Sequence, residues 1–360
     1  MIYTFSEVLE IHNGKNQRNV ENKNGNYPIY GSGGIIGFAD KYLCDEPAVI
    51  IGRKGSINNP IFVDKPFWNV DTAFALVPNS SLLDVRYLYY FCLSYNFNIL
   101  STTVTIPSLT KFNLLKVKIE VPSLEEQKQI VHKLDKIEMI IGLKERQLKD
   151  LEGFIRSRFI EMFGHSDRPK VRLGECCIIN PKKSSDIRLV DNDLMVSFVS
   201  MSDVSEDGQI VTCNHKQYES VKSGFTYFSE NDVLFAKITP CMENGKGGIA
   251  KGLLNGIGFG STEFHVLRPI DQVSNSCWLY ELTSFPQFRQ AAEINMTGSA
   301  GQRRVPASFL ANYKVSLPPI SLQNQFADFV HQLDKSKLAV QKSLDELKIL
   351  KKSLMQTYFG

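Results

Sequence analysis

The chain has 360 residues, of which 43% are hydrophobic and 22% are charged, and its formal net charge is +3. This composition is typical of two or three globular domains with buried cores, and it excludes wholesale disorder. A net charge this close to zero permits a nucleic-acid partner but does not indicate one by itself.

The beginning of the chain gives no sign of export. Its first ten residues carry two acids and lack the basic start and apolar core of a secretion signal. The seven cysteines include no C-x-x-C pair, which argues against a disulfide framework and against a zinc site. We therefore expect a cytoplasmic protein.

A glycine-rich segment at residues 27–37 (YPIYGSGGIIG) superficially suggests a nucleotide-binding loop. Its spacing fits neither G-x-G-x-x-G after a strand nor the Walker pattern, so we predict tight turns in a small β-structure. Residues 85–100 form the most apolar stretch, which is too short for a membrane span, contains Arg86 and predicts a packed amphipathic helix. In the corresponding aromatic segment of the second half, Pro286 predicts a shorter or kinked helix.

Two short apolar runs, residues 47–52 and 232–236, are bounded by turn-forming residues and predict buried strands. Each run opens into a basic, glycine-bearing loop, at residues 52–56 and at residues 237–248. Glycine allows close approach of the backbone, Lys and Arg neutralise phosphates, and Asn, Ser or Glu side chains read base edges. These loops are candidates for DNA contact, although most surface loops of this composition are merely solvated.

Residues 122–164 and 320–360 predict two long helical arms. Their apolar residues recur at steps of three and four, as in a coiled-coil seam, and each arm starts with serine and glutamine suited to capping. An arm of about 38 residues, roughly 57 Å long, is too thinly apolar to be stable alone. We predict that the arms pack antiparallel; the alternative is that each lies on its own domain. The expected seam residues are Leu134, Ile141, Leu148, Leu151, Ile155, Leu333, Val340, Leu344, Leu347 and Leu354.

An internal repeat organises the chain, since several segments recur in the same order in both halves. The paired segments are residues 71–74 with 261–264, 106–107 with 305–306, 123–127 with 321–325, and 131–136 with 330–335. This duplication predicts an α+β fold with pseudo-two-fold symmetry. Two globular α/β domains are expected to be separated by the pair of long antiparallel helices.

Catalytic motifs are missing from the sequence. A DNA methyltransferase would carry an Asn- or Asp-Pro-Pro-aromatic motif, and the nearest strings, at residues 58–61 and 179–182, lack the second proline and the aromatic residue. There is no Walker loop and no metal-binding pattern of Cys and His. His132 and His331 occupy matching positions in the arms, but a base without a nearby nucleophile is usually a surface or packing residue. We therefore expect no catalysis by this chain.

The order domain, arm, domain, arm resembles the specificity subunit of Type I restriction-modification systems. The arms of this chain begin S-L-x-x-Q, contain V-H-x-L-D-K and close in Phe-Gly. Residues 30–34, 51–57 and 71–72 resemble one group of recognition domains in that family, and residues 235–240 with 260–264 resemble another. The likeness covers nearly the whole chain.

The resemblance implies target-recognition domains at residues 1–121 and 165–319 and helical arms at residues 122–164 and 320–360. Each domain would read one half of a split, asymmetric site in double-stranded DNA. The arms would set the spacing and dock two methyltransferase subunits, and restriction subunits would join that core. No cofactor is expected on this chain, because S-adenosylmethionine, ATP and Mg belong to partner subunits of a complex that methylates adenine N6 and cleaves DNA.

The loops of both domains are expected to supply the DNA contacts. The basic residues expected to contact phosphates are Lys15, Arg18, Arg53, Lys54, Lys182, Lys183, Lys237, Lys246, Arg303 and Arg304. The residues expected to read bases are Ser56, Glu243 and Asn244. Two other classes stay open at this point: a coiled-coil scaffold whose globular ends bind proteins, and an enzyme that modifies DNA by itself.

Overall fold

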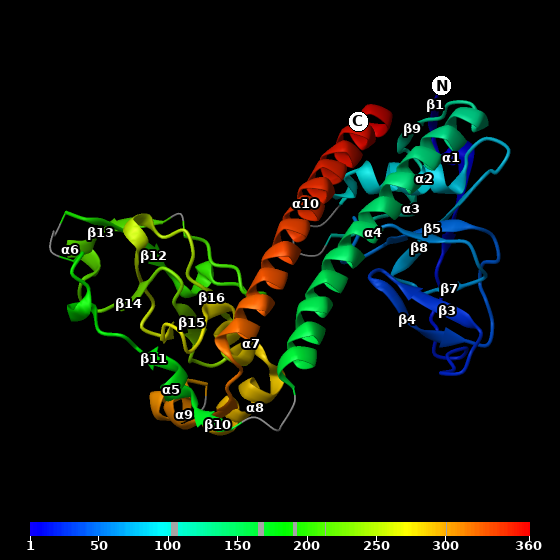
Figure 1. The fold of residues 1–360 in the computed structure, drawn as a ribbon. Coiled ribbons are helices and arrows are strands. Elements are labelled where there is room, and N and C mark those ends of the chain that lie inside the picture. Colours follow the sequence, from blue (N-terminus) through cyan, green and yellow to red (C-terminus); the bar gives the residue numbers. More distant parts are fainter. Residues whose placement is uncertain (102–106, 165–168, 190–192, 213, 300) are drawn as a thin grey trace. The chain divides into compact units, whose positions relative to one another are not determined.

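The computed structural model describes residues 1–101, 107–164, 169–189, 193–212, 214–299 and 301–360 (Figure 1). Ile106, one member of a paired segment, and Cys213 lie outside these residues. The chain separates into two compact units, the first made of residues 1–147 and 340–360 and the second of residues 148–339. These units differ from the domains expected from the sequence, because each arm is divided between the two units. The expected boundaries came from the internal repeat, whereas the units reflect which segments pack together.

The first unit is built on a four-stranded antiparallel sheet. In spatial order its strands are β2 (Leu9–Asn13), β8 (Ala73–Pro78), β5 (Ala48–Gly52) and β6 (Ile61–Val63). Every residue of β5 is buried, which confirms the strand predicted at residues 47–52. Helix α2 (Val85–Ser94) packs on this sheet, and Val49 and Ile51 join its aromatic side chains in one core while Ala48 and Ile50 enter another.

Smaller elements complete the first unit. The hairpin of β3 (Tyr27–Gly31) and β4 (Gly34–Ala39) carries the glycine-rich segment and, with β7 (Trp68–Asn69), forms a three-stranded sheet in which β3 and β7 run parallel. This confirms the predicted small β-structure. The remaining elements are β1 (Ile2–Thr4), α1 (Phe5–Val8), the 3-10 turn η1 (Phe97–Leu100), α3 (Lys111–Leu114) and β9 (Lys118–Glu120), of which β1 and β9 pair.

The second unit repeats this plan. Its main sheet has the order β11 (Cys177–Ile179), β18 (Phe264–Pro269), β15 (Val233–Ala236) and β16 (Gly247–Ile249). Its other sheet has the order β13 (His215–Gln217), β12 (Met195–Val199), β17 (Ile257–Gly260) and β14 (Thr226–Ser229). Strands β12 and β17 run parallel, as β3 and β7 do, so the second unit has one extra strand on the same framework. The duplication read from the sequence is therefore present in the topology.

The helices of the second unit follow the same order. The remaining elements are β10 (Lys170–Arg172), α5 (Leu173–Cys176), η2 (Lys183–Ser185), η3 (Met201–Asp203), α6 (Tyr218–Val221), η4 (Leu254–Gly256), α7 (Ser276–Ser284), α8 (Pro286–Ile294), α9 (Ala307–Asn312) and β19 (Lys314–Ser316). Helix α7 packs on the main sheet as α2 does in the first unit. Pro286 opens α8 directly after α7 ends, which confirms the predicted interruption.

The backbone pairing corrects two alignments made from the sequence, that of residues 71–74 with 261–264 and that of residues 106–107 with 305–306. Gly52 at the end of β5 lies opposite Ala73, and Ala236 at the end of β15 lies opposite Phe264. Thr72 therefore corresponds to Glu263, one position away from the alignment of residues 71–74 with 261–264. The shared phenylalanine in the two strings produced that alignment, although the two rings occupy different positions of the ladder.

The arms are α4 (Leu124–Phe163) and α10 (Ile320–Phe359), and each contributes to both units. In the first unit Glu145 lies 3.0 Å from Lys348, and Glu138 pairs with Lys351. Because the partner number rises on one helix as it falls on the other, the helices pack antiparallel, as predicted. In the second unit the ring of Phe326 lies 5.4 Å from those of Phe159 and Phe163. Among the seam residues, Leu134, Ile141, Ile155, Val340 and Leu344 are buried, and Leu148, Leu151, Leu333, Leu347 and Leu354 are half-buried.

A buried glutamine joins the start of each arm to the globular part of its unit. Gln127 accepts a hydrogen bond from the Asp84 backbone N–H at 2.8 Å and donates to the carbonyls of Leu82 and Pro122. The capping box at this helix start is formed instead by Ser123 and Glu126.

Gln323 makes the same three bonds in the second unit. It accepts from the N–H of Asn275 at 3.0 Å and donates to the carbonyls of Val273 and Pro318 at 2.9 Å. Gln323 is thus the counterpart of Gln127, whereas the repeated strings pair Gln127 with Gln325, which is exposed. Repeated short strings in a helix align equally well in neighbouring registers, and only the contacts decide between them.

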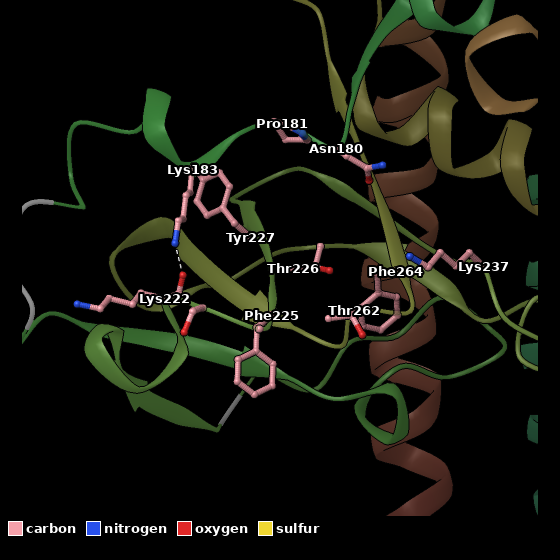
Figure 2. A pocket seen from close by; sticks show the side chains of 12 residues that line it. Asn180, Pro181, Lys183, Lys222, Phe225, Thr226, Tyr227, Lys237, Thr262 and Phe264 are labelled. Atoms are coloured by element: carbon pink, nitrogen blue, oxygen red, sulfur yellow. Dashed lines mark hydrogen bonds between the residues drawn. The ribbon is translucent and has the colours of Figure 1, made fainter. Parts of the chain in front are cut away.

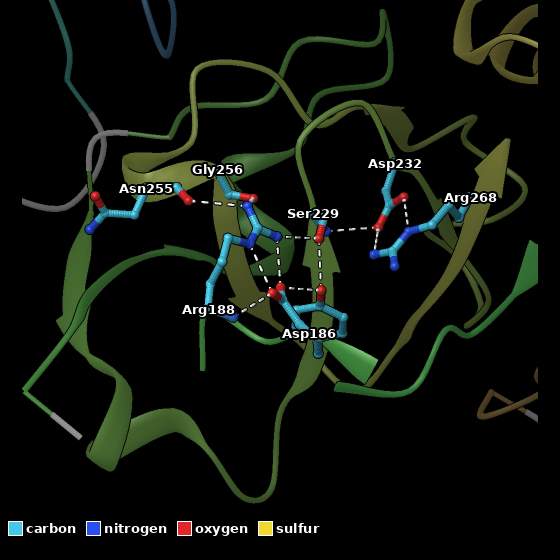
Figure 3. A network of polar contacts seen from close by, with 8 residues as sticks. Asp186, Arg188, Ser229, Asp232, Asn255, Gly256 and Arg268 are labelled. Atoms are coloured by element: carbon cyan, nitrogen blue, oxygen red, sulfur yellow. Dashed lines mark hydrogen bonds and ion pairs between the residues drawn. The ribbon is translucent and has the colours of Figure 1, made fainter. Parts of the chain in front are cut away.

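Asp186 anchors a polar network in the second unit (Figure 3). Its carboxylate accepts from Arg188 at 2.6 and 2.8 Å and from the Tyr227 hydroxyl at 2.6 Å, and its side chain is only 7% exposed. The hydrogen bonds from Arg188 hold the pKa of Asp186 well below its usual value. Nearby, Arg268 forms a bidentate pair with the buried carboxylate of Asp232.

Asp186 is expected to make the stability of the second unit dependent on pH. A lowered pKa in the folded state means that the stabilisation is complete above the unfolded value, near pH ~3.9, and is lost as the pH falls below it. The D186N variant should lose about 2 kcal/mol at neutral pH, because charged hydrogen bonds are weakened. Urea unfolding between pH 3 and 7 measures this, and a difference between D186N and wild type that stays constant across the range would contradict it.

Candidate nucleic-acid interface

The first unit gathers three loops beside the end of β5. The backbone N–H of Arg53 donates to the carbonyl of Thr72 at 2.7 Å, and the Arg53 carbonyl accepts from Leu109 at 2.9 Å. The backbone N–H of Lys15 donates to the Asn69 carbonyl at 2.9 Å, which ties the loop after β2 to the segment that precedes β8. The loops that carry Lys15 and Arg53, which the sequence separates widely, are therefore both bonded to residues 69–72.

Glycines shape the loop that follows β5. A Cβ atom at Gly52 would lie 2.4 Å from the Ser56 carbonyl oxygen, and Gly55 has a φ of +80°, which strains residues with side chains. The guanidinium of Arg53 lies 5.7 Å from the centre of the Phe74 ring. The candidate residues of the first unit, all exposed, are Lys15, Arg18, Arg53, Lys54 and Ser56.

Lys237 occupies in the second unit the position that Arg53 has in the first. It follows the end of β15 directly, its N–H donates to the Glu263 carbonyl at 2.9 Å, and its carbonyl accepts from Val305 at 2.9 Å. Since Thr72 corresponds to Glu263, the same backbone clamp holds a basic residue at the same end of the central strand in both units. Leu109 and Val305 close the clamp on its other side, so they correspond to each other, and the alignment of residues 106–107 with 305–306 is wrong by three positions. Two unlike loops thus start from equivalent, positively charged positions.

A cavity of about 430 Å³ lies beside Lys237 (Figure 2). Lys183, Lys222 and Lys237 line it together with Phe225 and Thr262, and the Lys183 ammonium donates to the Lys222 carbonyl. Several ammonium groups around one hollow favour an anion such as a phosphate. The sequence marked Lys183 and Lys237 but missed Lys222, because it lies 39 positions from Lys183 in an unremarkable turn. Lys182, the neighbouring candidate, is exposed.

Two candidate cations of the second unit already have acidic neighbours. Arg304 pairs with Glu263, with nitrogen to oxygen distances of 2.7 and 2.9 Å, and its hydrogen bonds lower the pKa of Glu263. Arg303 lies 3.7 Å from Glu243, which also accepts a hydrogen bond from the Thr239 hydroxyl at 2.9 Å. In the structure, Arg304 therefore clamps two chain segments together, and Glu243 is tied into its own loop.

The other two candidates lie in the turn after Lys237. Asn244 is exposed near the tip of this turn, and its N–H donates to the Pro240 carbonyl at 2.9 Å. Lys246 is half-buried and its ammonium donates to the carbonyl of Met201 at 3.2 Å. Asn244 is thus the better placed of the two to reach a ligand.

Two other features are absent from the described ranges, a cluster of metal-binding side chains and a membrane-spanning helix. These ranges contain no group of three or more His, Cys, Asp and Glu side chains arranged to hold a metal ion. No helix in the part of the chain that the structure describes is long and apolar enough to cross a bilayer. Burial raises the pKa of Cys177 to about 12 and that of Cys277 to about 12, so both thiols are protonated at neutral pH and poorly nucleophilic.

Comparisons with known proteins agree on one family. The model of the Type I restriction modification DNA specificity domain matches residues 1–153 and again residues 166–348. The specificity subunits of the type I restriction enzymes EcoEI and EcoAI from Escherichia coli are 37% identical over 197 residues and 38% identical over 188 residues. These alignments cover 52% and 50% of this chain but 32% and 31% of the relatives, so the matched part spans about a third of their length.

Solved structures share the fold at low sequence identity. The S subunit of a type I restriction-modification system from M. genitalium superposes with a TM-score of 0.62 at 14% identity, covering 100% of this chain and 96% of the other. A chain from a study of complex assembly and conformational transition of the type I R-M system gives a TM-score of 0.60 at 17% identity, covering 100% and 97%.

Proposed function

We propose that this chain, which belongs to the Type I restriction modification DNA specificity family, reads a split, asymmetric site in double-stranded DNA, one half with each unit. The observation that carries the proposal is the equivalent placement of Arg53 and Lys237 by the same backbone clamp. A cation fixed at the same end of two duplicated sheets suits the phosphate contacts that position a reader on DNA. The loops that start there differ, so the two half-sites would differ too.

The arms would set the spacing of the half-sites and dock two methyltransferase subunits, with restriction subunits joining through the complex. Large apolar side chains remain exposed on both arms, as expected of a helix surface that a partner covers. They are Met139, Leu143, Phe154, Ile160, Leu338, Ile349 and Leu350. In this proposal the chain is a non-catalytic cytoplasmic subunit, and S-adenosylmethionine, ATP and Mg are held by its partners.

Selection of random-sequence duplex DNA by the purified chain, with and without methyltransferase subunits, tests the proposal. The expected result is enrichment of one bipartite sequence, without methylation by the chain alone. Methylation by the isolated chain would instead identify an enzyme. Failure to bind DNA even with the partners present would favour a protein-binding scaffold.

The loop after β5 gives a sharper prediction. Replacing Arg53 and Lys54 by alanine should weaken DNA binding and reduce the slope of log K against log salt by about one unit for each phosphate that is no longer neutralised. The matched control is K118A, which removes an exposed lysine from β9 in the same unit. If the salt slope of the double variant equals that of K118A, this loop does not contact DNA phosphates.

A further inference from the structure

The turn after Lys237, residues 238–246, is folded tightly on itself. The N–H of Met242 donates to the Ile238 carbonyl at 2.9 Å and the N–H of Lys246 donates to the Cys241 carbonyl at 3.0 Å. The Met242 side chain is fully buried, whereas Asn244 is exposed. The turn therefore has a fixed inner side, and Asn244 is its exposed polar side chain.

A single guanidinium holds that inner side. Arg289, on α8 and only 7% exposed, donates to the carbonyls of Met242 at 3.0 Å and Gly245 at 3.1 Å and to the Thr283 carbonyl at 2.7 Å. The Lys246 carbonyl lies 3.4 and 3.5 Å from its two terminal nitrogens. Its guanidinium carbon also lies 4.5 Å from the centre of the Phe235 ring.

Arg289 has no carboxylate partner among the residues that the structure covers. Burial lowers its pKa to about 10, so the group is still charged at neutral pH. A buried charge is costly unless its donors are satisfied, and here backbone carbonyls satisfy them in place of an acid. An apolar side chain would fill the same space at less cost, so the arrangement suggests that the geometry of the turn is what matters.

We propose that Arg289 is a positioning residue for DNA recognition, which fixes residues 238–246 so that Asn244 is presented to base edges in the second half-site. This inference rests on the proposed function and deepens it. An asparagine amide pairs with the N6 and N7 atoms of adenine, so adenine is the base expected opposite Asn244. Arg289 itself contacts only protein.

Among the described residues of the first unit, no buried arginine holds the loop after β5 in this way. Its loop after β5 is short and is shaped by Gly52 and Gly55, and α2 is followed by η1 rather than by a second helix. The effect of changing Arg289 should therefore be confined to the second half-site. This asymmetry separates a role in positioning from a general loss of folding.

The experiment compares wild type, R289Q and N244A, each as the full chain with methyltransferase subunits, on the selected bipartite duplex and on duplexes with single base changes. R289Q is expected to reduce discrimination at one adenine of the second half-site by about tenfold or more, at the same base pair as N244A. Discrimination in the first half-site should not change, and the salt slope should stay nearly the same, because Lys183, Lys222 and Lys237 lie outside the turn. The double variant should lose no more than N244A alone.

The matched control is R268Q, which breaks the pair with buried Asp232 at the other end of β15. It should lower the stability of the second unit but keep base discrimination. If R289Q and R268Q discriminate equally well between bases of the second half-site, the inference is wrong. If R289Q does not fold, R289K replaces it in the same comparison. Wild type that fails to bind DNA refutes the proposed function instead, so the two failures are distinguishable.

Discussion

The L344D variant is expected to lose about 4 kcal/mol of folding free energy in the first unit, since it places a charge without a partner in a buried seam. Leu344 lies on α10, is 3% exposed and belongs to the first unit together with the first half of α4. Urea unfolding followed by a probe in that unit measures the loss. The matched control is I349D on the same helix, where the side chain is 70% exposed and the cost should stay below about 1 kcal/mol.

Equal unfolding midpoints for L344D and I349D would contradict packing of the arms.

The structure also distinguishes two substitutions for which the sequence predicts the same effect. Leu148 is only half-buried, so L148D should cost less than L344D. The apolar spacing along the arms predicted both positions as seam residues, but the degree of burial depends on neighbours that this spacing does not specify.

Replacing either buried glutamine by alanine is expected to cost about 3 kcal/mol in its own unit. Q127A leaves the Asp84 N–H and two carbonyls without partners, and Q323A does the same around Asn275. The control is Q325A, which removes an exposed glutamine two positions from Gln323 and should be nearly neutral. Hydrogen exchange reports each unit separately, and a neutral Q323A would refute the anchoring role.

Sequence patterns predicted the large elements of this fold well. Continuous apolar runs identified β5 and β15, because both faces of these strands are covered, and apolar spacing identified the arms. The break at Pro286 followed from the missing N–H of proline. These features depend on local chemistry that a single stretch of sequence contains.

Pairings between distant residues were less predictable. The correspondence of Thr72 with Glu263 and the role of Gln323 depend on register, which similar strings leave open by one to three positions. Lys222 reaches the cavity, Arg304 turns to Glu263 and Arg289 reaches three carbonyls of a remote turn only through tertiary packing. The positions of the interface residues could be predicted from loop composition, but their hydrogen bonds and ion pairs with other residues of the chain could not.

The composition of the first unit has a consequence for synthesis of the protein. Residues 340–360 complete its core, and Phe359 lies 5.0 Å from the ring of Tyr87. A nascent chain on the ribosome therefore exposes an unfinished amino-terminal unit until every residue of the second unit has been made. Long-range closure of this kind is slow and leaves apolar surface open in the meantime. The unit that is translated first is the one that matures last, which makes it the more exposed of the two to chaperones and proteases.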